Sequence, residues 1–308
     1  MECFVLGIGG MMPMPHRRLS SVALRVNGEL YLFDCGEGTQ VPYKELHLGL
    51  RTLRVVLISH LHADHVLGLP GMLMLRAQMP DPGPLTLVGP PGLGRFVRNV
   101  RADLRMHVRY PLEFVEWSKQ AGELAYEDEL VRVRWQPLSH SVFCLGYRVE
   151  EHQRPGRFDP AAAEGLGVPA GPLYGRLQRG ETVTTPAGET VTPEQVLGPT
   201  RRGRQVALVT DTVRTPRLQP LLHDVDLAFV ESMFLPEHAD EAAEKRHMTA
   251  EQAVEVAREA GARRLVLLHI SPRYDNRELK QFAKIAREGH PRAEVAREGQ
   301  LIEIPLPD

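Results

Sequence analysis

The spacing of apolar positions predicts strands throughout most of the chain. Residues 22–26 and 29–33 flank Asn27-Gly28, a dipeptide typical of a two-residue hairpin turn. The chain also begins in a strand pattern. Further strands are predicted at residues 53–58, 85–88, 131–138, 205–210, 226–230, 264–268 and 300–304.

Helical periodicity lies between these strands. The sequence predicts helices at residues 68–78, with an interruption near Pro70, and at 94–106, 250–260 and 277–288. Thr249 and Gln252 have the spacing of a capping box, and Gly261 ends the third of these helices. Interleaved helices and strands predict a mixed α/β (α+β) fold.

The pattern dissolves between residues 152 and 200 into proline, glycine and charge, with Gly171-Pro172-Leu173-Tyr174-Gly175 at its centre. A segment of this length without a core pattern is uncommon inside a compact domain and is usually functional or disordered. We interpret it as a protruding arm. The alternative is a surface loop without a role.

Length and composition favour one domain with an insertion, because 308 residues with 43% hydrophobic content can bury a large core. The three cysteines, Cys3, Cys35 and Cys144, are scattered and odd in number, which favours a reducing compartment, by default the cytoplasm. No apolar run approaches the ~18 residues that a membrane span needs, so no membrane association is expected.

The net charge of −2 argues against broad nonspecific binding to nucleic acid. Three local clusters of arginine are nevertheless candidates for contact with phosphates. They are His16-Arg17-Arg18, Arg201-Arg202 with Arg204, and the helically spaced Arg95, Arg98, Arg101, Arg105 and Arg109. For the last cluster the favoured interpretation is a solvated helix face.

The segment His60-Leu61-His62-Ala63-Asp64-His65 holds four potential metal ligands directly after the strand at 53–58. The ligands alternate and then double, which favours a short irregular loop around two ions over a helix with ligands four residues apart. Imidazole and carboxylate without thiolate favour zinc, although manganese and iron also accept such ligands. The alternative is a polar loop that is merely rich in histidine.

Three other predicted strands also end in a possible ligand. His140 follows the strand at 131–138, Asp211 follows that at 205–210, and His269 follows that at 264–268. Each of these residues alone has an ordinary explanation. Together with the histidine-rich segment they predict one edge of a sheet structure where ligands for two metals meet.

These residues resemble the metallo-β-lactamase superfamily, whose His-x-His-x-Asp-His hallmark is matched at His60, His62, Asp64 and His65. Within it the chain is similar to the tRNase Z family. That similarity rests on blocks spread over most of the chain, namely Ser20-Ser21, residues 33–40, residues 60–73, Gly171-Pro172-Leu173-Tyr174-Gly175-Arg176-Leu177, Arg179-Gly180-Glu181, Leu197-Gly198-Pro199, Asp211-Thr212 and residues 269–274.

The resemblance implies a four-layer αβ/βα sandwich over residues 1–308, with a tRNA-binding arm at 152–200 inserted within it. It also implies two Zn²⁺ per subunit, a homodimer, and a precursor tRNA substrate cut at the 3′ side of the discriminator base to leave a 3′-OH. One zinc would take His60, His62 and His140, the other Asp64, His65 and His269, and Asp211 would bridge. Asp64 would also orient the nucleophile, His247 would act as general acid, and Glu231 would orient His247.

The resemblance further implies RNA contacts at Arg17, Arg18, Arg176, Arg179, Ser271 and Arg273. Two loops depart from the family pattern, since residues 13–18 lack its lysine and asparagine and residues 230–233 keep only Glu231. Asp34 either supports a ligand or is structural. The alternative functions are a hydrolase of small esters or phosphodiesters, which would not need the arm, and a non-catalytic RNA-binding homologue, which would have little reason to keep all seven ligand positions.

Overall fold

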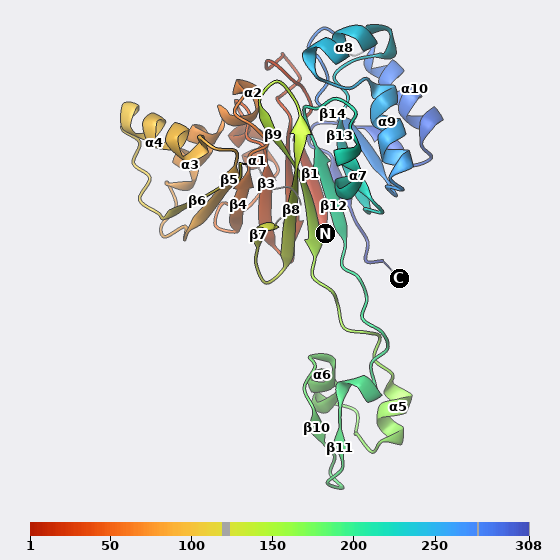
Figure 1. Cartoon of the computed structure of the whole chain (residues 1–308). Coiled ribbons are helices and arrows are strands. Elements are labelled where there is room, and N and C mark those ends of the chain that lie inside the picture. The colour runs from red at the N-terminus through yellow and green to blue at the C-terminus, as the bar shows by residue number, and fades with distance from the viewer. Residues whose placement is uncertain (119–123, 276, 308) are drawn as a thin grey trace. The chain divides into compact units, whose positions relative to one another are not determined.

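The computed structural model describes residues 1–118, 124–275 and 277–307, and it divides into two compact units (Figure 1). The first unit comprises Met1–Glu150 and Gln205–Pro305. The second comprises Glu151–Arg204 and the last residues of the chain.

The first unit contains two seven-stranded sheets. The order of the first sheet is β16 (Leu301–Glu303), β1 (Glu2–Gly7), β2 (Ser21–Val26), β3 (Glu29–Phe33), β4 (Leu53–Leu57), β5 (Leu85–Gly89) and β6 (Leu112–Glu116). The order of the second is β15 (Ala293–Val295), β14 (Leu265–Leu268), β13 (Leu227–Glu231), β12 (Gln205–Val209), β9 (Phe143–Glu151), β8 (Val131–Ser139) and β7 (Leu124–Glu127). Strands β3 to β6 and strands β12 to β15 pair in parallel.

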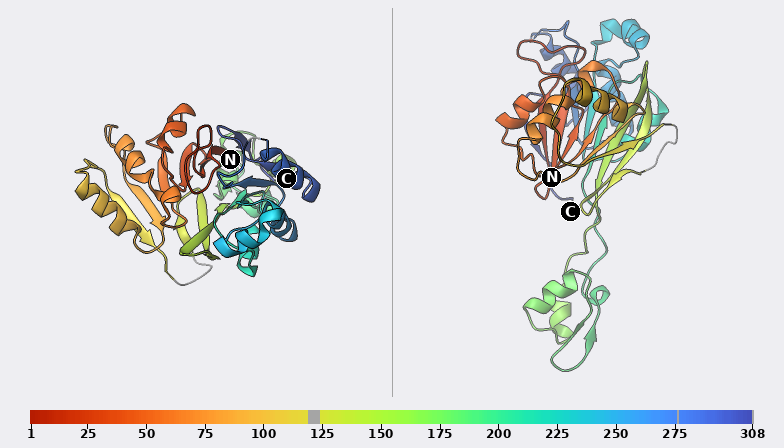
Figure 2. Two further views of the ribbon diagram at one scale, coloured as in Figure 1. Left: turned by 90° about the horizontal axis from the view of Figure 1, so that it is seen from above. Right: turned by 90° about the vertical axis from the view of Figure 1, so that its left-hand side faces the viewer.

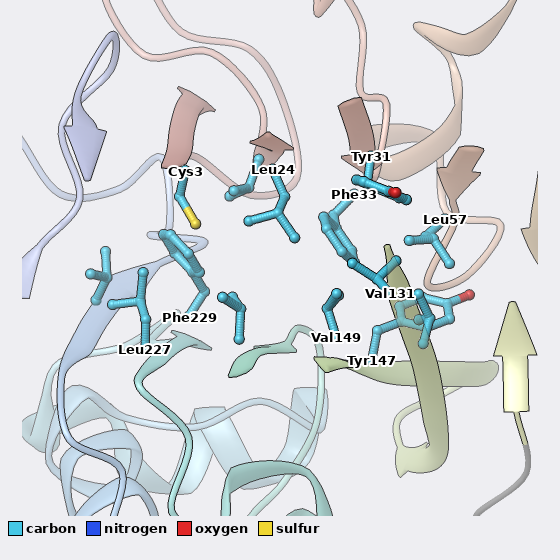
Figure 3. Close-up of a cluster of buried hydrophobic side chains, with 14 of the residues drawn as sticks. Cys3, Leu24, Tyr31, Phe33, Leu57, Val131, Tyr147, Val149, Leu227 and Phe229 are labelled. Atoms are coloured by element: carbon cyan, nitrogen blue, oxygen red, sulfur yellow. The ribbon is translucent and has the colours of Figure 1, made fainter. Parts of the chain in front are cut away.

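Most of the central strands are buried on both faces. Since successive side chains point to opposite sides of a sheet, each of these strands contributes to two cores. In β1, Cys3 and Val5 join the core between the sheets, whereas Phe4 and Leu6 join the core under the helices. Figure 3 shows the core between the sheets, where Phe33 of β3 and Phe229 of β13 come from opposite layers.

Helices cover the outer face of each sheet, which completes the expected αβ/βα four-layer sandwich (Figure 2). On the first sheet these are α1 (Gln40–Glu45), α3 (Leu69–Arg76) and α4 (Leu93–Asp103). On the second they are α7 (Gln219–Leu222), α9 (Ala250–Glu259) and α10 (Leu279–Gly289). The one-turn α2 (Ala63–Val66) follows β4, and α8 (Ala239–Lys245) precedes α9.

The predicted helices are present with ends shifted by at most three residues, and two of them differ in a way that has a clear cause. Pro70 does not interrupt α3 but lies in its first turn, where a backbone N–H has no helical acceptor to lose. Helix α4 begins at Leu93 and ends at Asp103, because Arg105 adopts a left-handed conformation with φ 50°. Strands β6, β7, β9 and β15 were not predicted.

The second unit has its own small core, which the sequence pattern did not reveal. It contains α5 (Pro160–Gly165), α6 (Pro172–Gln178), the hairpin of β10 (Val183–Thr184) and β11 (Thr190–Val191), and a 3₁₀ turn at Pro193–Gln195. Its buried apolar residues are Ala163, Val168, Leu177, Val183, Val191 and Val196. A single buried apolar residue in each of α5, α6, β10 and β11 gives no recognisable period along the sequence.

None of the helices in the described ranges is both long enough and apolar enough to span a membrane.

Candidate metal centre

The predicted ligand residues converge at one edge of the sandwich. His60 lies after β4 in the first sheet, whereas His140, Asp211 and His269 lie after β8, β12 and β14 in the second. Strands β12, β13 and β14 are parallel, so their carboxyl ends share an edge. The prediction that these strand ends meet is therefore confirmed.

The first ligand group surrounds His62. Its Nδ1 lies 2.9 Å from Nε2 of His60 and 3.3 Å from Nε2 of His140. Asp211 Oδ2 lies 3.7 Å from Nε2 of both of those histidines. Three imidazole nitrogens and one carboxylate oxygen thus face a common point.

The second group contains Asp64, His65 and His269. Asp64 Oδ2 lies 3.5 Å from Nε2 of His65 and of His269, and these two nitrogens are 3.2 Å apart. Asp211 Oδ1 lies 3.4 Å and 3.2 Å from the same nitrogens. The two oxygens of Asp211 therefore face different groups, which is the arrangement of a bridging ligand.

The segment that carries four of these donors is more regular than the expected loop. His62 is extended, with ψ 151°, and Asp64 and His65 lie in helix α2, which begins at Ala63. A helix of four residues is too short to give a periodic pattern. Its single turn is what separates His62 from His65, so that they join different groups.

Hydrogen bonds behind the ligands fix their orientation. Nδ1 of His65 donates to Asp34 Oδ2 at 2.7 Å, and Nδ1 of His140 donates to the carbonyl of Arg246 at 3.1 Å. Each ring then presents its Nε2 lone pair to the centre. The backbone N–H of Met11 donates to Asp64 Oδ2 at 2.7 Å. Through its hydrogen bond with His65, Asp34 therefore supports a ligand residue.

The backbone is strained at several of these positions. Non-glycine residues with positive φ include Met11 at 66°, Asp34 at 52°, Arg246 at 59° and His269 at 59°. Such conformations cost free energy and are common at functional sites. The sequence did not reveal Met11 and Arg246, because both act through backbone atoms that any residue type carries.

Burial and the neighbouring histidines favour neutral imidazole at His60 and His140. Burial, aided by the neighbouring His65, holds the pKa of His60 well below its usual value, and burial also lowers the pKa of His140. Burial alone would raise the pKa of Asp211, but the surrounding histidines hold it well below its usual range. Neutral nitrogen donors and ionised carboxylates are the forms that bind metal, so these residues fit a divalent cation.

His247 and Glu231 form a pair beside the centre. Nδ1 of His247 donates to Glu231 Oε1 at 3.0 Å, and its Nε2 lies 3.9 Å from Asp211 Oδ2. Burial would lower the pKa of His247, but the carboxylate of Glu231 outweighs it and raises that pKa to about 9. Glu231 is fixed in turn by the backbone N–H groups of Thr212 and Met233.

The residues expected to contact RNA form two sets, one buried and one more exposed and paired with glutamates. Arg17 is buried and donates to the carbonyls of Ser271 and Tyr274, and Ser271 is buried too. The others are more exposed and pair with glutamates. Arg18 pairs with Glu45 and Glu298, Arg176 and Arg179 pair with Glu181, and Arg273 pairs with Glu241.

Comparison with known proteins agrees with this geometry. Residues 17–213 match the metallo-beta-lactamase superfamily, and residues 168–270 match a beta-lactamase superfamily domain. A ribonuclease Z of Treponema denticola is 42% identical over 308 residues, which cover 100% of this chain and 99% of that protein. The chain belongs to the ribonuclease Z family.

Other members of the ribonuclease Z family support this assignment. The protein of Salinibacter ruber is 43% identical over 302 residues, which cover 97% of this chain and 93% of that protein. Among solved structures, human short-form tRNase Z matches the fold of this chain with a TM-score of 0.72 at 24% identity. The match covers 99% of this chain and 100% of the human chain. The expected fold is confirmed. The expected class of enzyme, a metal-binding hydrolase of the ribonuclease Z family, is confirmed as well.

Proposed function

We propose that the protein is a zinc-dependent endoribonuclease that cuts precursor tRNA at the 3′ side of the discriminator base, removes the 3′ trailer and leaves a 3′-OH. Membership of the ribonuclease Z family supports the reaction and the substrate class. The observation that carries the chemistry is Asp211, whose two oxygens face separate groups of nitrogen and oxygen donors.

Two zinc ions per subunit fit these donors. His60, His62 and His140 would hold one ion, Asp64, His65 and His269 would hold the other, and Asp211 would bridge them. When bound, such ions act as Lewis acids toward the scissile phosphate and lower the pKa of water at the site. Nitrogen and oxygen donors without sulfur suit zinc.

Asp64 and His247 are the residues proposed to act on the reacting atoms. Asp64 keeps Oδ2 on the Met11 N–H and would orient the attacking nucleophile. His247 in its protonated form can give its Nε2 proton to the leaving 3′ oxygen, because Nδ1 is already used by Glu231. Glu231, fully buried, holds the ring in that orientation and favours the charged form.

The second unit is proposed to grip the substrate. Residues 152–200 would act as the tRNA-binding arm of an otherwise single domain, and in a homodimer the arm of one subunit would hold tRNA cut by the other. Arg18, Arg176, Arg179 and Arg273 would exchange their glutamate partners for phosphate. Arg17 and Ser271 would act indirectly, by joining two loops beside the centre. A cytoplasmic location suits the three free buried cysteines.

The test is incubation of the purified protein with a precursor tRNA labelled in its 3′ trailer, with and without a chelator. We expect one cut directly after the discriminator base, loss of the cut with chelator, and recovery when zinc is restored. The His60→Ala variant should not cut. Failure of the zinc-loaded protein to cut any of several precursors would contradict the proposal.

A further inference from the structure

Helix α4 carries a row of arginines on its solvent side. Leu93 and Val97 are buried against the first sheet, whereas Arg95, Arg98 and Arg101 follow at intervals of three residues along the other side, and Arg105 lies just after the end of the helix. Arg95, Arg98 and Arg105 are exposed, and Arg101 is half-buried. We call these four arginines the α4 basic face.

The arginines of the α4 basic face lack acidic partners, unlike the arginines exposed on strand β8. Arg132 and Arg134 on β8, for example, pair with Glu127 at 2.5 Å and Glu150 at 3.1 Å. Across the described ranges, no carboxylate lies within ion-pair distance of the four arginines of α4. Arg98 instead lies 5.7 Å above the Phe114 ring, and Arg101 donates to the Val108 carbonyl. Positive charge is therefore concentrated here on a chain with a net charge of −2.

The α4 basic face begins at the metal edge. Strand β5 pairs in parallel with β4, so the chain enters α4 beside the segment that carries His60 and His62. Leu61 packs there, since a Cβ at Gly92 would lie 3.3 Å from its Cδ1. With 11 residues, the helix runs for about 16 Å from that edge.

The first turn of α4 does not itself offer an anion site. Glu116 accepts hydrogen bonds from the backbone N–H groups of Gly92 and Gly94, at 3.3 Å and 2.7 Å. Any attraction for phosphate therefore comes from the arginine side chains and is a matter of charge.

We propose that the α4 basic face binds the phosphates of the 3′ trailer of the substrate as that strand leaves the metal centre. The inference rests on the proposed function, which brings the scissile phosphate to this edge. A trailer has no fixed sequence or shape, and arginines without base-reading partners recognise phosphate charge alone. Where the sequence favours a solvated helix face, the proposal gives these arginines a role because the face begins at the metal edge.

The experiment compares the triple variant R95Q/R98Q/R105Q with the control R132Q/R134Q, which removes paired arginines from β8. Glutamine keeps the length and helix propensity of the side chain. Each protein is assayed at several salt concentrations on one precursor tRNA with either a single-nucleotide trailer or a long single-stranded trailer. Zinc content and circular dichroism confirm that each protein is folded and loaded.

For the long trailer we expect the triple variant to raise KM about 10-fold and to flatten the dependence of log kcat/KM on log salt by about 0.7 for each lost contact. The single-nucleotide trailer and the control variant should give wild-type values. Replacement by lysine, as R95K/R98K/R105K, should restore most of the salt dependence.

Three results would overturn the inference. An equal loss on both trailers would assign the α4 basic face to the tRNA body, an equal loss in the control would indicate only general charge, and no loss would leave the face without a role in binding. In all three cases wild-type protein still cuts the precursor. Failure of the proposed function would instead appear as no cut by any variant on either substrate.

Discussion

The metal centre and the second unit are built in opposite ways. At the centre, donors from distant parts of the chain are brought together by long-range strand pairing, and backbone strain at Arg246 and His269 is held by the surrounding sandwich. In the second unit all of the structure forms within Glu151–Arg204 and the chain end, around six small apolar side chains.

This difference fits the proposed division of labour, in which the centre carries the chemistry and the second unit binds tRNA. Ligands and proton donors need positions fixed to within fractions of an ångström, which a two-sheet core provides. A surface that binds a folded RNA needs positive charge and must extend to the RNA. A small module can provide both without a large hydrophobic core. Changes at the centre should therefore act on every substrate, and changes in the second unit only on tRNA.

The largest effect should come from Asp211→Ala. Because Asp211 faces both ligand groups, its loss should weaken both metal sites and lower kcat for precursor tRNA and for bis-p-nitrophenyl phosphate alike, by roughly 10⁴-fold. The measurements are both rates and the bound zinc by elemental analysis. The control is Asp240→Ala, which removes an exposed aspartate of α8. A variant that lost activity on only one of the two substrates would break the proposed separation.

His247→Ala should have a smaller and more selective effect. A general acid matters when the leaving oxygen is a poor leaving group, so precursor cleavage should fall about 10²- to 10³-fold. Nitrophenolate needs no proton, so hydrolysis of bis-p-nitrophenyl phosphate should stay within about 3-fold of wild type. Both rates are measured at full zinc loading. Equal losses would mean that His247 supports the metal site and not proton transfer.

Removal of the second unit should cost precursor cleavage about 10²-fold, mainly through KM, and leave the small phosphodiester unaffected. The chain allows a clean excision, because Glu150 and Gln205 are direct partners in the antiparallel β9–β12 pair. Replacing residues 152–203 by Asn-Gly would turn these strands into a two-residue hairpin. Wild-type kcat/KM on precursor tRNA after this excision would refute the role proposed for the arm.

The sequence predicted the centre better than its surroundings. His60, Asp211 and His269 could be placed because each follows a strand whose apolar run is easily recognised, and parallel strands end at one edge. Strand β9 was missed because Phe143–Glu151 is buried on both faces at most positions and so does not alternate. Contacts made by the backbone of Met11 and Arg246 leave no trace in residue type.

The internal elements of the second unit were missed for a different reason. The prolines and glycines of this unit mark the starts of short helices and the turns between elements. Pro160 and Pro172 occupy the first turns of α5 and α6, and Gly180 and Gly188 take positive φ in turns. Elements of two to seven residues are too short to show a period of 3.6, so the sequence pattern did not reveal them.

The smallest effect, and the finest test of the comparison, should come from Leu177→Ala. Leu177 is fully buried in the small core of the second unit, and its truncation should cost that unit about 2–5 kcal/mol. A core of six side chains has little stability to spare, so amides of residues 160–197 should exchange much faster while those of both sheets keep their protection. Precursor cleavage should fall by about 10-fold or less, because bound tRNA can restore the folded unit. The half-buried Leu166 gives the matched control, Leu166→Ala, with a weaker response expected in both measurements. Loss of protection in the sheets as well would mean that the two units unfold together, in one cooperative transition, and that the centre and the second unit are not independent.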